Sequence, residues 1–504
     1  MRFAPSPTGP LHMGGVRTAL YNYLFAKQHN GKFILRIEDT DQTRLVPEAE
    51  KYIREALAWC GISPDESPQQ PSGQIKYRQS ERKDTYKQYA LQLINSGHAY
   101  YAFDTADELT AVREAAKKAG SPNWQYNHVT RASMKNSLTL AQNEVDKKLA
   151  NGDPYVIRLK LSRNDEIKVQ DQVRGWVNVN TNNMDDKVLF KADGMPTYHL
   201  ANVVDDHLME ISHVIRGEEW LPSLPLHILL YRYLGWEDSR PEFAHLPLIL
   251  KPDGKGKLSK RDGDRLGFPV FPIEWRNSDG EIYPGYRENG YLPEGFINML
   301  AFLGWNPGTE QEIFELPELV ENFSLAKVHK AGAKFDPAKT KWFNQQHLRK
   351  CSNSQLARYL CTFAEEHGHK PSEKYCLKVV ELIKERAYLL PDLYKESIYL
   401  FVRPAHYDEK TVRKKWNSQA RSVINDFCER FEKLDPFEAE TIESNFKEYL
   451  SANDLGFGKA APGLRLALTG KAQGPSLFAI CDILGKEETL QRLRAALQKL
   501  PSDG

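Results

Sequence analysis

The sequence predicts an α/β protein that is interrupted by an α+β insertion and followed by an all-α C-terminal part. Between residues 1 and 100, short apolar strands alternate with amphipathic helices, which is typical of a parallel sheet. Over residues 101–195 a charged helix is followed by segments of alternating polarity, which indicates antiparallel strands. The α/β pattern returns over 196–250, and from about residue 346 almost every segment is helical in pattern. With 504 residues, the chain is too long for a single core.

The chain begins with the unusual stretch "MRFAPSPTGPLHMGG". Residues 2–4 can only form the end of a strand, because Pro5 and Pro7 have no N–H to donate to a β-ladder. A helical pattern starts at Val16, so we expect "HMGG" to lie on a loop that opens a helix. Backbone amides at a helix N-terminus attract phosphate, and glycine lets a ligand approach the backbone closely. Taken alone, the stretch is better explained by an ordinary glycine turn that carries a solvated histidine.

The next predicted strand, "KFILRIED", ends in acidic residues, and an amphipathic helix, "EAEKYIREALAWCGI", follows it. Ligands of open α/β sheets bind at the carboxyl ends of the strands. Glu38 and Asp39 are therefore candidates to meet an ammonium group or a ribose hydroxyl. A charged turn after a strand explains these two residues equally well.

The predicted insertion contains the helix "ADELTAVREAAKKAG" and then "YVIRLKLS", "EIKVQDQVRGWVNV" and "KVLFKADGMPTYHL", which alternate in polarity. After it, the apolar run "HVIR" ends in Arg216. An unpaired buried charge is costly, so this arginine needs a carboxylate or a similar partner. A structural pair with Glu218 or Glu219 is the alternative to a ligand. Tyr198 and Asn202 stand in an equally apolar segment upstream.

A glycine-flanked basic segment, "GKGKLSKRDG", spans Gly254 to Gly263. It carries Lys257, Lys260 and Arg261, and it is predicted to be a flexible loop. Mobile cationic loops suit a triphosphate that must be clamped and then released. By itself, the segment is better explained as a solvated basic loop.

Composition indicates a globular protein without a membrane segment. Hydrophobic residues make up 41% and charged residues 27% of the chain, and no run approaches the ~20 apolar residues of a membrane helix. No signal peptide precedes the first strand. The 6 cysteines form no C-x-x-C pair, which favours reduced thiols in a cytosol over disulfides or a zinc site. We therefore expect a cytoplasmic protein without a membrane anchor, a bound metal or structural zinc.

The net charge of +1 means that a polyanionic partner would have to be bound by local patches. Two segments are candidates: "KVHKAGAKFDPAKTKW", from Lys327, and "EKTVRKKWNSQAR", from Glu409. Both are rich in lysine and arginine with tryptophan among them. A solvated helix face explains each of them equally well in isolation.

Five motifs occur in the order "PSPTGPLHMGG", "RIEDTD", "YHLANVVDDH", "VIRGEEW" and "KLSKR". In this order they resemble the bacterial glutamyl-tRNA synthetases, in which "HMGG" corresponds to the HIGH signature of class I and "KLSKR" to the KMSKS signature. The resemblance covers most of residues 1–265 and resumes at "FDPAKTKWFN". It implies a Rossmann-like catalytic domain over residues 1–100 and 196–250, split by an acceptor-end-binding insertion over 101–195, then a stem-contact domain over 251–345 and a helical anticodon-binding domain over 346–504.

The resemblance also implies a reaction and its residues. L-Glutamate would be activated by ATP, with Mg²⁺ accompanying the ATP, to glutamyl-adenylate and pyrophosphate, and glutamate would then be transferred to the 3′-terminal adenosine of tRNA(Glu). The implied catalytic residues are His12, Lys257 and Lys260. The implied ATP-binding residues are Pro7, Gly9, His12, Gly14, Gly15, Glu219, Lys257, Ser259 and Lys260. The implied glutamate-binding residues are Arg2, Ala4, Ser6, Glu38, Tyr198, Asn202 and Arg216, and tRNA contacts are expected from Arg413, Lys414 and Lys415.

Some features depart from the family or leave alternatives open. The insertion lacks the cysteine cluster that holds zinc in many relatives, and the proline-rich segment 268–289 is longer than the resemblance leads one to expect.

A glutaminyl-tRNA synthetase shares the catalytic core but generally ends in β-barrels, whereas this C-terminus is helical in pattern. A shortened paralogue that modifies a tRNA base would lack the anticodon domain. An inactive RNA-binding relative is disfavoured because His12, Lys257 and Lys260 are intact. We expect a monomer.

Overall fold

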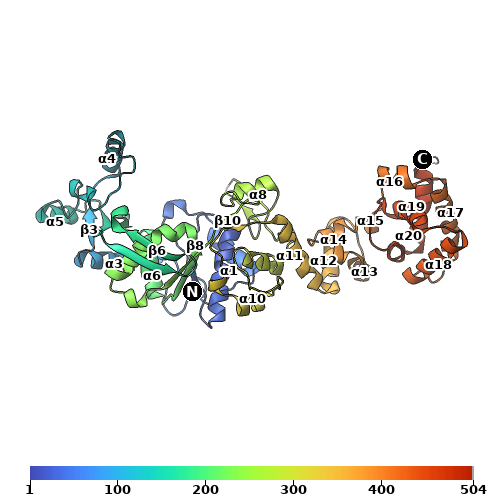
Figure 1. Ribbon diagram of the computed structural model, residues 1–504, viewed down its shortest axis with the longest axis horizontal. Helices are drawn as coiled ribbons and strands as arrows, with labels where there is room; N and C mark the ends of the chain where they lie inside the picture. Colours follow the sequence, from blue (N-terminus) through green and yellow to red (C-terminus); the bar gives the residue numbers. More distant parts are fainter. Residues whose placement is uncertain (278, 502–504) are drawn as a thin grey trace. The chain divides into compact units, whose positions relative to one another are not determined.

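The computed structural model describes residues 1–277 and 279–501, apart from the side chains of residues 260, 261 and 264. The chain folds into two compact units (Figure 1). The first comprises Met1–Glu288 and Phe296–Lys339, and the second comprises Asn289–Gly295 together with the chain from Thr340 onward. The division after Lys339 lies close to residue 346, where the sequence predicts the start of the all-helical part.

A short parallel ladder begins the first unit. β1 (Arg2–Phe3) pairs in parallel with β2 (Ile34–Leu35). β1 ends early because Pro5 has no N–H to donate, but the Pro5 carbonyl still accepts the amide of Glu38 at 3.0 Å. This hydrogen bond holds the acidic end of the second strand beside the loop that follows the first.

The helix α1 (Met13–Gln28) begins earlier than the predicted start at Val16. His12 is its N-cap, because the Nδ1 atom of this residue accepts the backbone N–H of Gly14 at 3.1 Å. Gly15 packs closely: a Cβ atom there would lie 2.5 Å from the side chain of Leu11, which would have to move. The "HMGG" stretch is therefore the first turn of a helix and not a separate loop.

The insertion carries its own antiparallel sheet, of order β3–β4–β7. A small core of Tyr100, Ala102, Tyr126 and Met134 packs near it. The predicted helix of the insertion is present as α4 (Ala106–Lys118), which has no buried residue. The elements of this sheet and its neighbourhood are β3 (Ala99–Ala102), α5 (Gln142–Ala150), β4 (Val156–Leu159) and β7 (Val188–Phe190).

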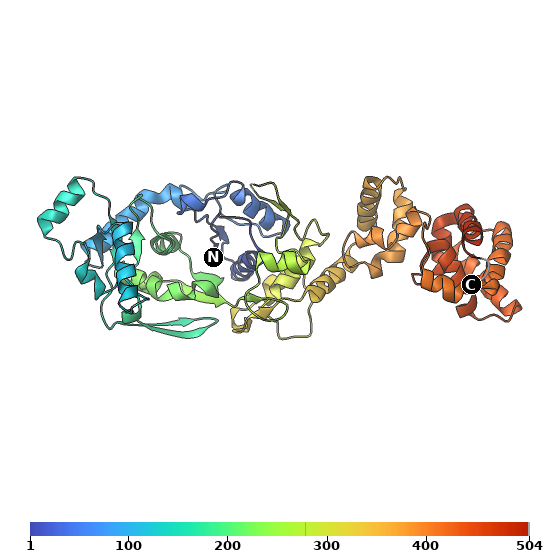
Figure 2. The ribbon, with the colours of Figure 1, turned by 90° about the horizontal axis from the view of Figure 1, so that it is seen from above.

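A second sheet combines strands from the insertion and from the returning α/β segment, in the order β6–β5–β9–β8. Figure 1 labels β6 and β8 of this sheet, and Figure 2 shows its long hairpin in teal. The hairpin of β5 (Glu166–Asp171) and β6 (Gly175–Asn180) is antiparallel, as predicted. β5 then pairs in parallel with β9 (Glu242–Leu246), and β9 with β8 (His213–Gly217). The predicted boundary at residue 195 therefore does not coincide with a sheet boundary, and the predicted single parallel sheet consists of two separately hydrogen-bonded pieces.

Helices complete the buried core of this region. Apolar side chains of α6 (Tyr198–Leu208) and α7 (Leu224–Tyr233) share one buried cluster with the strands β4, β5, β7, β8 and β9. The remaining helices of this part are α2 (Ala49–Trp59), as predicted, and α3 (Lys83–Asn95).

The segment that contains "KLSKR" is more ordered than predicted. The helix α8 (Lys260–Leu266) begins inside the stretch that the sequence predicts as a loop, and Leu258 is buried with its amide bonded to the Ile249 carbonyl. The segment 268–289 forms the hairpin of β11 (Trp275–Arg276) and β12 (Ile282–Tyr283). The other elements before the second unit are β10 (Ile249–Leu250), α9 (Pro293–Ala301), α10 (Leu316–Asn322) and β13 (Ala333–Lys334), of which β10 and β13 are parallel.

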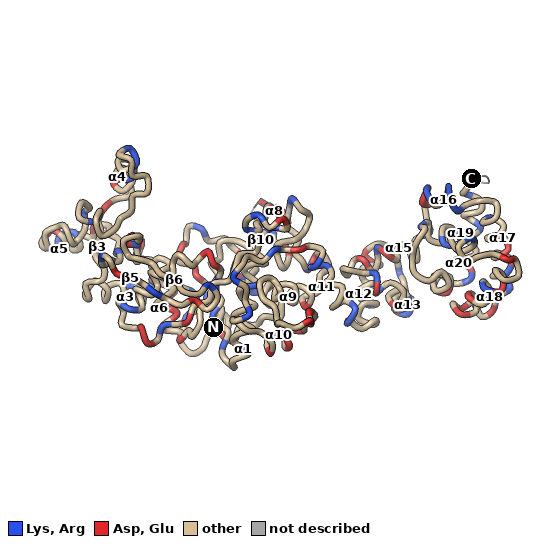
Figure 3. The backbone as a smooth tube through the Cα atoms, in the orientation of Figure 1, with Lys and Arg blue, Asp and Glu red and all other residues tan. Residues whose placement is uncertain are grey.

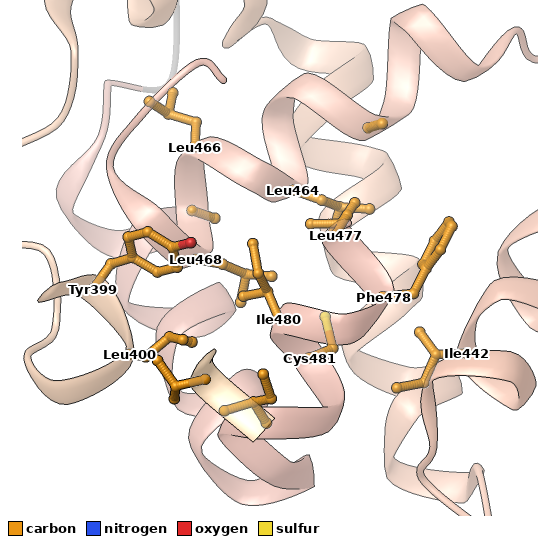
Figure 4. Packing of buried hydrophobic residues seen from close by; sticks show 14 of the residues in the cluster. Tyr399, Leu400, Ile442, Leu464, Leu466, Leu468, Leu477, Phe478, Ile480 and Cys481 are labelled. Carbon is orange, nitrogen blue, oxygen red and sulfur yellow. The ribbon is translucent and has the colours of Figure 1, made fainter. Parts of the chain in front are cut away.

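The second unit is helical, as the sequence predicts. One buried cluster runs from Leu348 to Ala496, and Figure 4 shows part of it, where Ile442, Leu464 and Ile480 gather from different helices. The helices are α11 (Pro337–Lys350), which crosses from the first unit, α12 (Asn353–Glu366), α13 (Glu373–Ile383), α14 (Asp392–Lys395), α15 (Ile398–Phe401), α16 (Glu409–Lys415), α17 (Ser418–Lys433), α18 (Ala439–Ala452), α19 (Phe457–Thr469) and α20 (Leu477–Lys499).

Candidate active site

A cavity of about 300 Å³ opens beside the carboxyl ends of β1 and β8. Its position agrees with the rule that ligands of α/β sheets bind at the carboxyl ends of the strands. Every residue that the sequence predicts for glutamate lines it: Arg2, Ala4, Ser6, Glu38, Tyr198, Asn202 and Arg216.

Arg216 is 5% exposed and makes hydrogen bonds from each of its guanidinium nitrogens. Nε donates to Nε2 of His245 at 2.9 Å, and Nη1 donates to the hydroxyl of Tyr198 at 2.6 Å. Nη2 donates to the backbone carbonyl of Trp220 at 3.2 Å. All three acceptors are formally neutral groups, so the positive charge of the guanidinium is not neutralised by direct contact with a carboxylate.

The alternative partners predicted for Arg216 are wrong, because both glutamates are engaged elsewhere. Glu218 forms an ion pair with Arg174 at 2.8 Å. Glu219 forms an ion pair with Lys257 at 3.0 Å. The expectation of a carboxylate beside Arg216 therefore fails for the described contacts, and a histidine takes that place.

Arg2 has a structural as well as a cavity-lining position. Its Nε and Nη2 atoms donate to the two carboxylate oxygens of Asp206 at 3.0 and 3.2 Å, and among the described residues none contacts its Nη1. Asp206 also accepts from Arg36 at 2.7 Å. Burial opposes ionisation of Asp206, but the charges of Arg2 and Arg36 hold its pKa below the usual value.

The same network positions Glu38 at the cavity. Its Oε1 atom accepts from Arg36 at 3.1 Å and from the side-chain amide of Asn202 at 2.9 Å. Burial raises the pKa of Glu38, while the charge of Arg36 opposes that shift. The carboxylate and the amide are thus held together in the place where the sequence predicts contacts to the substrate ammonium and carboxylate.

A second cavity, of about 400 Å³, shares Gly14, Gly15, Thr18, Gly217 and Glu219 with the first. Of the residues predicted to bind ATP, its wall contains His12, Gly14, Gly15, Glu219, Lys257 and Ser259. The structure does not bring Pro7 or Gly9 to the wall of either cavity, and the side chain of Lys260 lies outside the described residues.

His12 presents an unused hydrogen-bonding atom at the second cavity. Because Nδ1 accepts from Gly14, the proton of the neutral ring is on Nε2. Nε2 is buried and has no partner among the described residues. Burial, together with the charge of Lys257, lowers the pKa of His12 to about 4, so the ring is neutral at pH 7. The N-cap histidine is therefore a neutral N–H donor without a protein acceptor.

The hairpin segment 268–289 contacts this end of α1. The Val270 carbonyl accepts the amide of Met13 at 2.9 Å, and the ring of Phe271 meets that of His12 edge-on at 6.3 Å. On the other side, the hydroxyl of Tyr52 donates to the Ile273 carbonyl at 2.6 Å. The long segment that the family resemblance left without an explanation thus covers the N-terminus of the helix.

The basic segment at the second cavity is tied down by acidic partners. Lys257 pairs with Glu219, as described above, and both side chains are about half exposed. Ser259 caps α8, with its hydroxyl 2.5 Å from a carboxylate oxygen of Asp262. An ammonium group has three N–H donors, so Lys257 keeps donors for a further anion while it is paired with Glu219.

Trp220 is a cavity residue that sequence reasoning missed. It is 41% exposed, lines the first cavity and lies 4.4 Å from the ring of Tyr198, centroid to centroid. Its signal in the sequence is a tryptophan directly after the acidic pair of "GEEW". His245 and Asp171 were also missed, and no local pattern indicates them.

The basic run predicted to bind tRNA lies on α16 of the second unit, where Figure 3 shows basic residues in blue. Its side chains are exposed. Arg413 pairs with Glu409 at 3.2 Å along the helix, while Lys414 and Lys415 are exposed. Trp416, which directly follows the basic residues in sequence, is only 1% exposed. It belongs to the helical core.

The described residues offer neither a grouped metal site nor a membrane-spanning helix. Within residues 1–277 and 279–501, no three histidine, cysteine or acidic side chains are grouped as a metal site would require. None of the helices in the described chain is both long and apolar enough to cross a membrane.

Two protein families match this chain. The family of class I tRNA synthetases (E and Q), catalytic domain, matches residues 1–342, and the anticodon binding domain family matches residues 347–497. The fold and the cavities described above are thus those of a class I tRNA synthetase with an anticodon-binding domain, and the predicted fold class is confirmed.

Relatives that match over the full length of the chain are glutamate–tRNA ligases. The glutamate–tRNA ligases of Flavobacterium johnsoniae and Flavobacterium psychrophilum are 54% and 55% identical over 99% of this chain and 99% of their own. The crystal structure of a glutamate tRNA ligase from Elizabethkingia meningosepticum in complex with its amino acid superposes with a TM-score of 0.96, at 50% identity over 99% of each chain. The chain belongs to the glutamate–tRNA ligase family.

Proposed function

We propose that this chain ligates L-glutamate to tRNA(Glu) at the expense of ATP. The observation that carries this proposal is Arg216, a buried guanidinium at a cavity wall whose protein acceptors are all neutral groups. Such a cation favours a carboxylate as the ligand. The names of the full-length relatives agree with glutamate as that ligand.

The glutamate side chain would pair with Arg216, and Tyr198 would add its hydroxyl. Glutamine would bind poorly, because its amide NH₂ group has no acceptor to offer to a guanidinium. Glu38 and Asn202, which the network of Arg36 holds together, would take the ammonium and the α-carboxylate of the substrate.

ATP would occupy the second cavity. The first turn of α1 offers backbone amides and a helix N-terminus to phosphate, and His12 offers its unused Nε2–H. Lys257 and Lys260 would neutralise the phosphate charge that increases in the transition state. Mg²⁺ prefers phosphate oxygens and water, so it would enter with the triphosphate.

The two reaction steps need little covalent help from the protein. An oxygen of the glutamate α-carboxylate attacks the α-phosphorus of ATP, and the bond to pyrophosphate breaks. The terminal adenosine hydroxyl of the tRNA then attacks the acyl carbon, and AMP leaves. The shared wall of Gly14, Gly15 and Gly217 would let the carboxylate and the α-phosphate approach each other.

The tRNA would contact both units. The acceptor end would be held by the insertion, and the anticodon loop by the helical unit, with Arg413, Lys414 and Lys415 attracting phosphate. We further propose that the protein is a cytoplasmic monomer; its free cysteines agree with a reducing compartment.

The experiment is aminoacylation of purified tRNA isoacceptors with labelled glutamate and labelled glutamine. We expect glutamate, and not glutamine, to be attached to tRNA(Glu) in an ATP-dependent reaction. Charging with glutamine, or no charging at all, would contradict the proposal. The same assay with tRNA(Gln) determines whether that tRNA also receives glutamate.

A further inference from the structure

Behind Arg216 lies a buried chain of hydrogen bonds that leads away from the cavity. The Nε atom of Arg216 donates to Nε2 of His245, and Nδ1 of His245 lies 2.6 Å from Oδ2 of Asp171. His245 is fully buried, and Asp171 is almost so. The chain joins three strands, because Arg216 lies on β8, His245 on β9 and Asp171 at the end of β5.

These hydrogen bonds determine which nitrogen of His245 carries the proton. Arginine can only donate, so Nε2 of His245 must accept and the ring proton must be on Nδ1, where it is donated to Asp171. Burial lowers the pKa of His245 below its ordinary value, and the charge of Arg216 adds to this shift while Asp171 opposes it, so the ring is neutral at pH 7. With the opposite tautomer, two N–H donors would point at each other.

Asp171 is itself held in place by backbone groups. Its Oδ1 atom accepts the amides of Val173 at 3.0 Å, of Arg174 at 2.7 Å and of His245 at 3.2 Å. The carboxylate is thus fixed by the turn of the β5–β6 hairpin, and Oδ2 remains for the histidine ring. The orientation of the ring follows from the hairpin.

We infer that Asp171 and His245 are positioning residues that hold Arg216 in the orientation needed to bind the substrate carboxylate. This inference rests on the proposed function. An imidazole ring between Asp171 and Arg216 orients the guanidinium while keeping the negative charge at a distance from it. A carboxylate in direct contact would neutralise the cation and weaken its attraction for a ligand.

The decisive variant is Asp171→Asn. The asparagine oxygen can still accept the three backbone amides, but its NH₂ group would face His245 and donate to Nδ1. The histidine proton would then move to Nε2 and point at the Nε–H of Arg216. We expect the KM for glutamate to rise about tenfold, as for the loss of one hydrogen bond to a charged group, with kcat and the KM for ATP nearly unchanged.

The matched control is Asp165→Asn, directly before the same hairpin, where Asp165 pairs with Arg232 at 3.0 Å and not with the cavity. This variant should leave the KM for glutamate unchanged. A second pair of variants concerns the histidine: the oxygen of His245→Gln can accept from Arg216, whereas His245→Leu cannot. We expect the glutamine variant to bind glutamate more tightly than the leucine variant.

The measurements are steady-state aminoacylation with glutamate and ATP varied separately, glutamate binding by calorimetry, and the preference for glutamate over glutamine. Equal KM values for glutamate in Asp171→Asn and Asp165→Asn, or parallel losses for ATP and glutamate, would overturn the inference. Failure of the unmodified protein to charge glutamate would instead overturn the proposed function, and the two failures are therefore distinguishable.

Discussion

At the scale of single residues, Arg216 and Arg2 differ although the sequence predicts the same role for both. Arg216 meets neutral acceptors and faces the cavity, whereas Arg2 binds both carboxylate oxygens of Asp206. Both are buried, so the difference lies in where the counter-charge is. For Arg216 the counter-charge has to come from a ligand, while for Arg2 most of it is already supplied by the fold.

The first prediction concerns Arg216→Ala. A hydrogen-bonded charge pair is worth roughly 1.5–3 kcal/mol, so the KM for glutamate should rise about ten- to a hundredfold. The affinity for ATP should change little, because Arg216 lines only the first cavity. Steady-state aminoacylation with each substrate varied separately measures both quantities. Equal losses for the two substrates would indicate a folding defect and contradict the assignment.

The second prediction separates the two roles of His12. His12→Ala should slow adenylate formation by about a hundredfold, or on the order of 3 kcal/mol, and Lys260→Ala should do the same. His12→Asn is the control, because asparagine can still cap α1 but cannot extend an N–H to the position of Nε2. We expect His12→Asn to be as slow as the alanine variant but more stable to heat. Near-normal activity of this variant would remove His12 from the chemistry.

The third prediction concerns pH. His227 is 1% exposed, its Nδ1 has no partner among the described residues, and burial followed by the charge of Arg216 lowers its pKa well below 6.5. The unfolded chain therefore binds a proton below pH 6.5 that the folded chain excludes, and the free energy of unfolding should fall by about 1.4 kcal/mol per pH unit from this group. The loss should continue as the pH falls until the folded pKa is reached.

Thermal unfolding between pH 7 and pH 5.5 tests this prediction, with His227→Gln for comparison. Glutamine does not titrate, so the variant should lose less stability across this range than the unmodified protein. Identical slopes would show that His227 contributes nothing to the pH dependence.

At the scale of helices and strands, short signals in the sequence were predictive and long-range pairings were not. Proline after the first strand, glycine in the first turn of α1 and charged residues in apolar runs are local signals, and their occurrence together in one order carries the family resemblance from which the cavity residues were predicted. The contacts of Arg216 with His245 and of His245 with Asp171 could not be predicted. His245 follows Arg216 by 29 residues in sequence, and Asp171 precedes His245 by 74. Such contacts depend on which strands become neighbours, and periodicity does not contain that information.

The first residues of α1 and α8 could not be predicted from hydrophobic periodicity either. α1 begins before Val16 because the ring of His12 caps it, and α8 begins at Lys260 because Ser259 and Asp262 form a capping box. In each case a side chain satisfies amides that the hydrophobic periodicity ignores. The prediction of a flexible loop over Gly254–Gly263 is therefore wrong from Lys260 onward, where α8 begins.

The fourth prediction belongs to α16. Reversing the charge at Arg413, Lys414 and Lys415 together should weaken tRNA binding and reduce its dependence on salt, because the net charge of +1 leaves local patches as the source of phosphate attraction. The affinity for ATP should be unchanged. Filter binding of tRNA at several salt concentrations measures both the affinity and the slope. An unaltered affinity would show that the run is only a solvated helix face.

At the scale of the whole molecule, the chain holds its insertion together by polar contacts. Asp186 is buried and accepts from Tyr100 at 2.8 Å and from Arg131 at 3.0 Å, while the guanidinium of Arg158 lies 4.0 Å from the ring centroid of Tyr126. These polar contacts lie beside the small apolar core of the insertion, to which Tyr100 and Tyr126 also belong.

The fifth prediction follows from these contacts and from the dispersed cysteines. The purified protein should contain no structural zinc, and chelators should leave its thermal unfolding unchanged. Elemental analysis by mass spectrometry is the measurement. A value close to one zinc per chain would contradict the prediction.

The wall shared by the two cavities has a consequence for inhibition. Gly217 and Glu219 line both cavities, and a Cβ atom at position 217 would lie 2.1 Å from the carboxylate of Glu219. One compound that joins an acidic amino-acid end to an adenosine end could occupy both cavities at once, and its second end would bind at a high effective concentration. Chelate-type ligands of this kind should therefore surpass either substrate in affinity by a wide margin, and the length of the linker across the glycines should govern how much of that gain is realised.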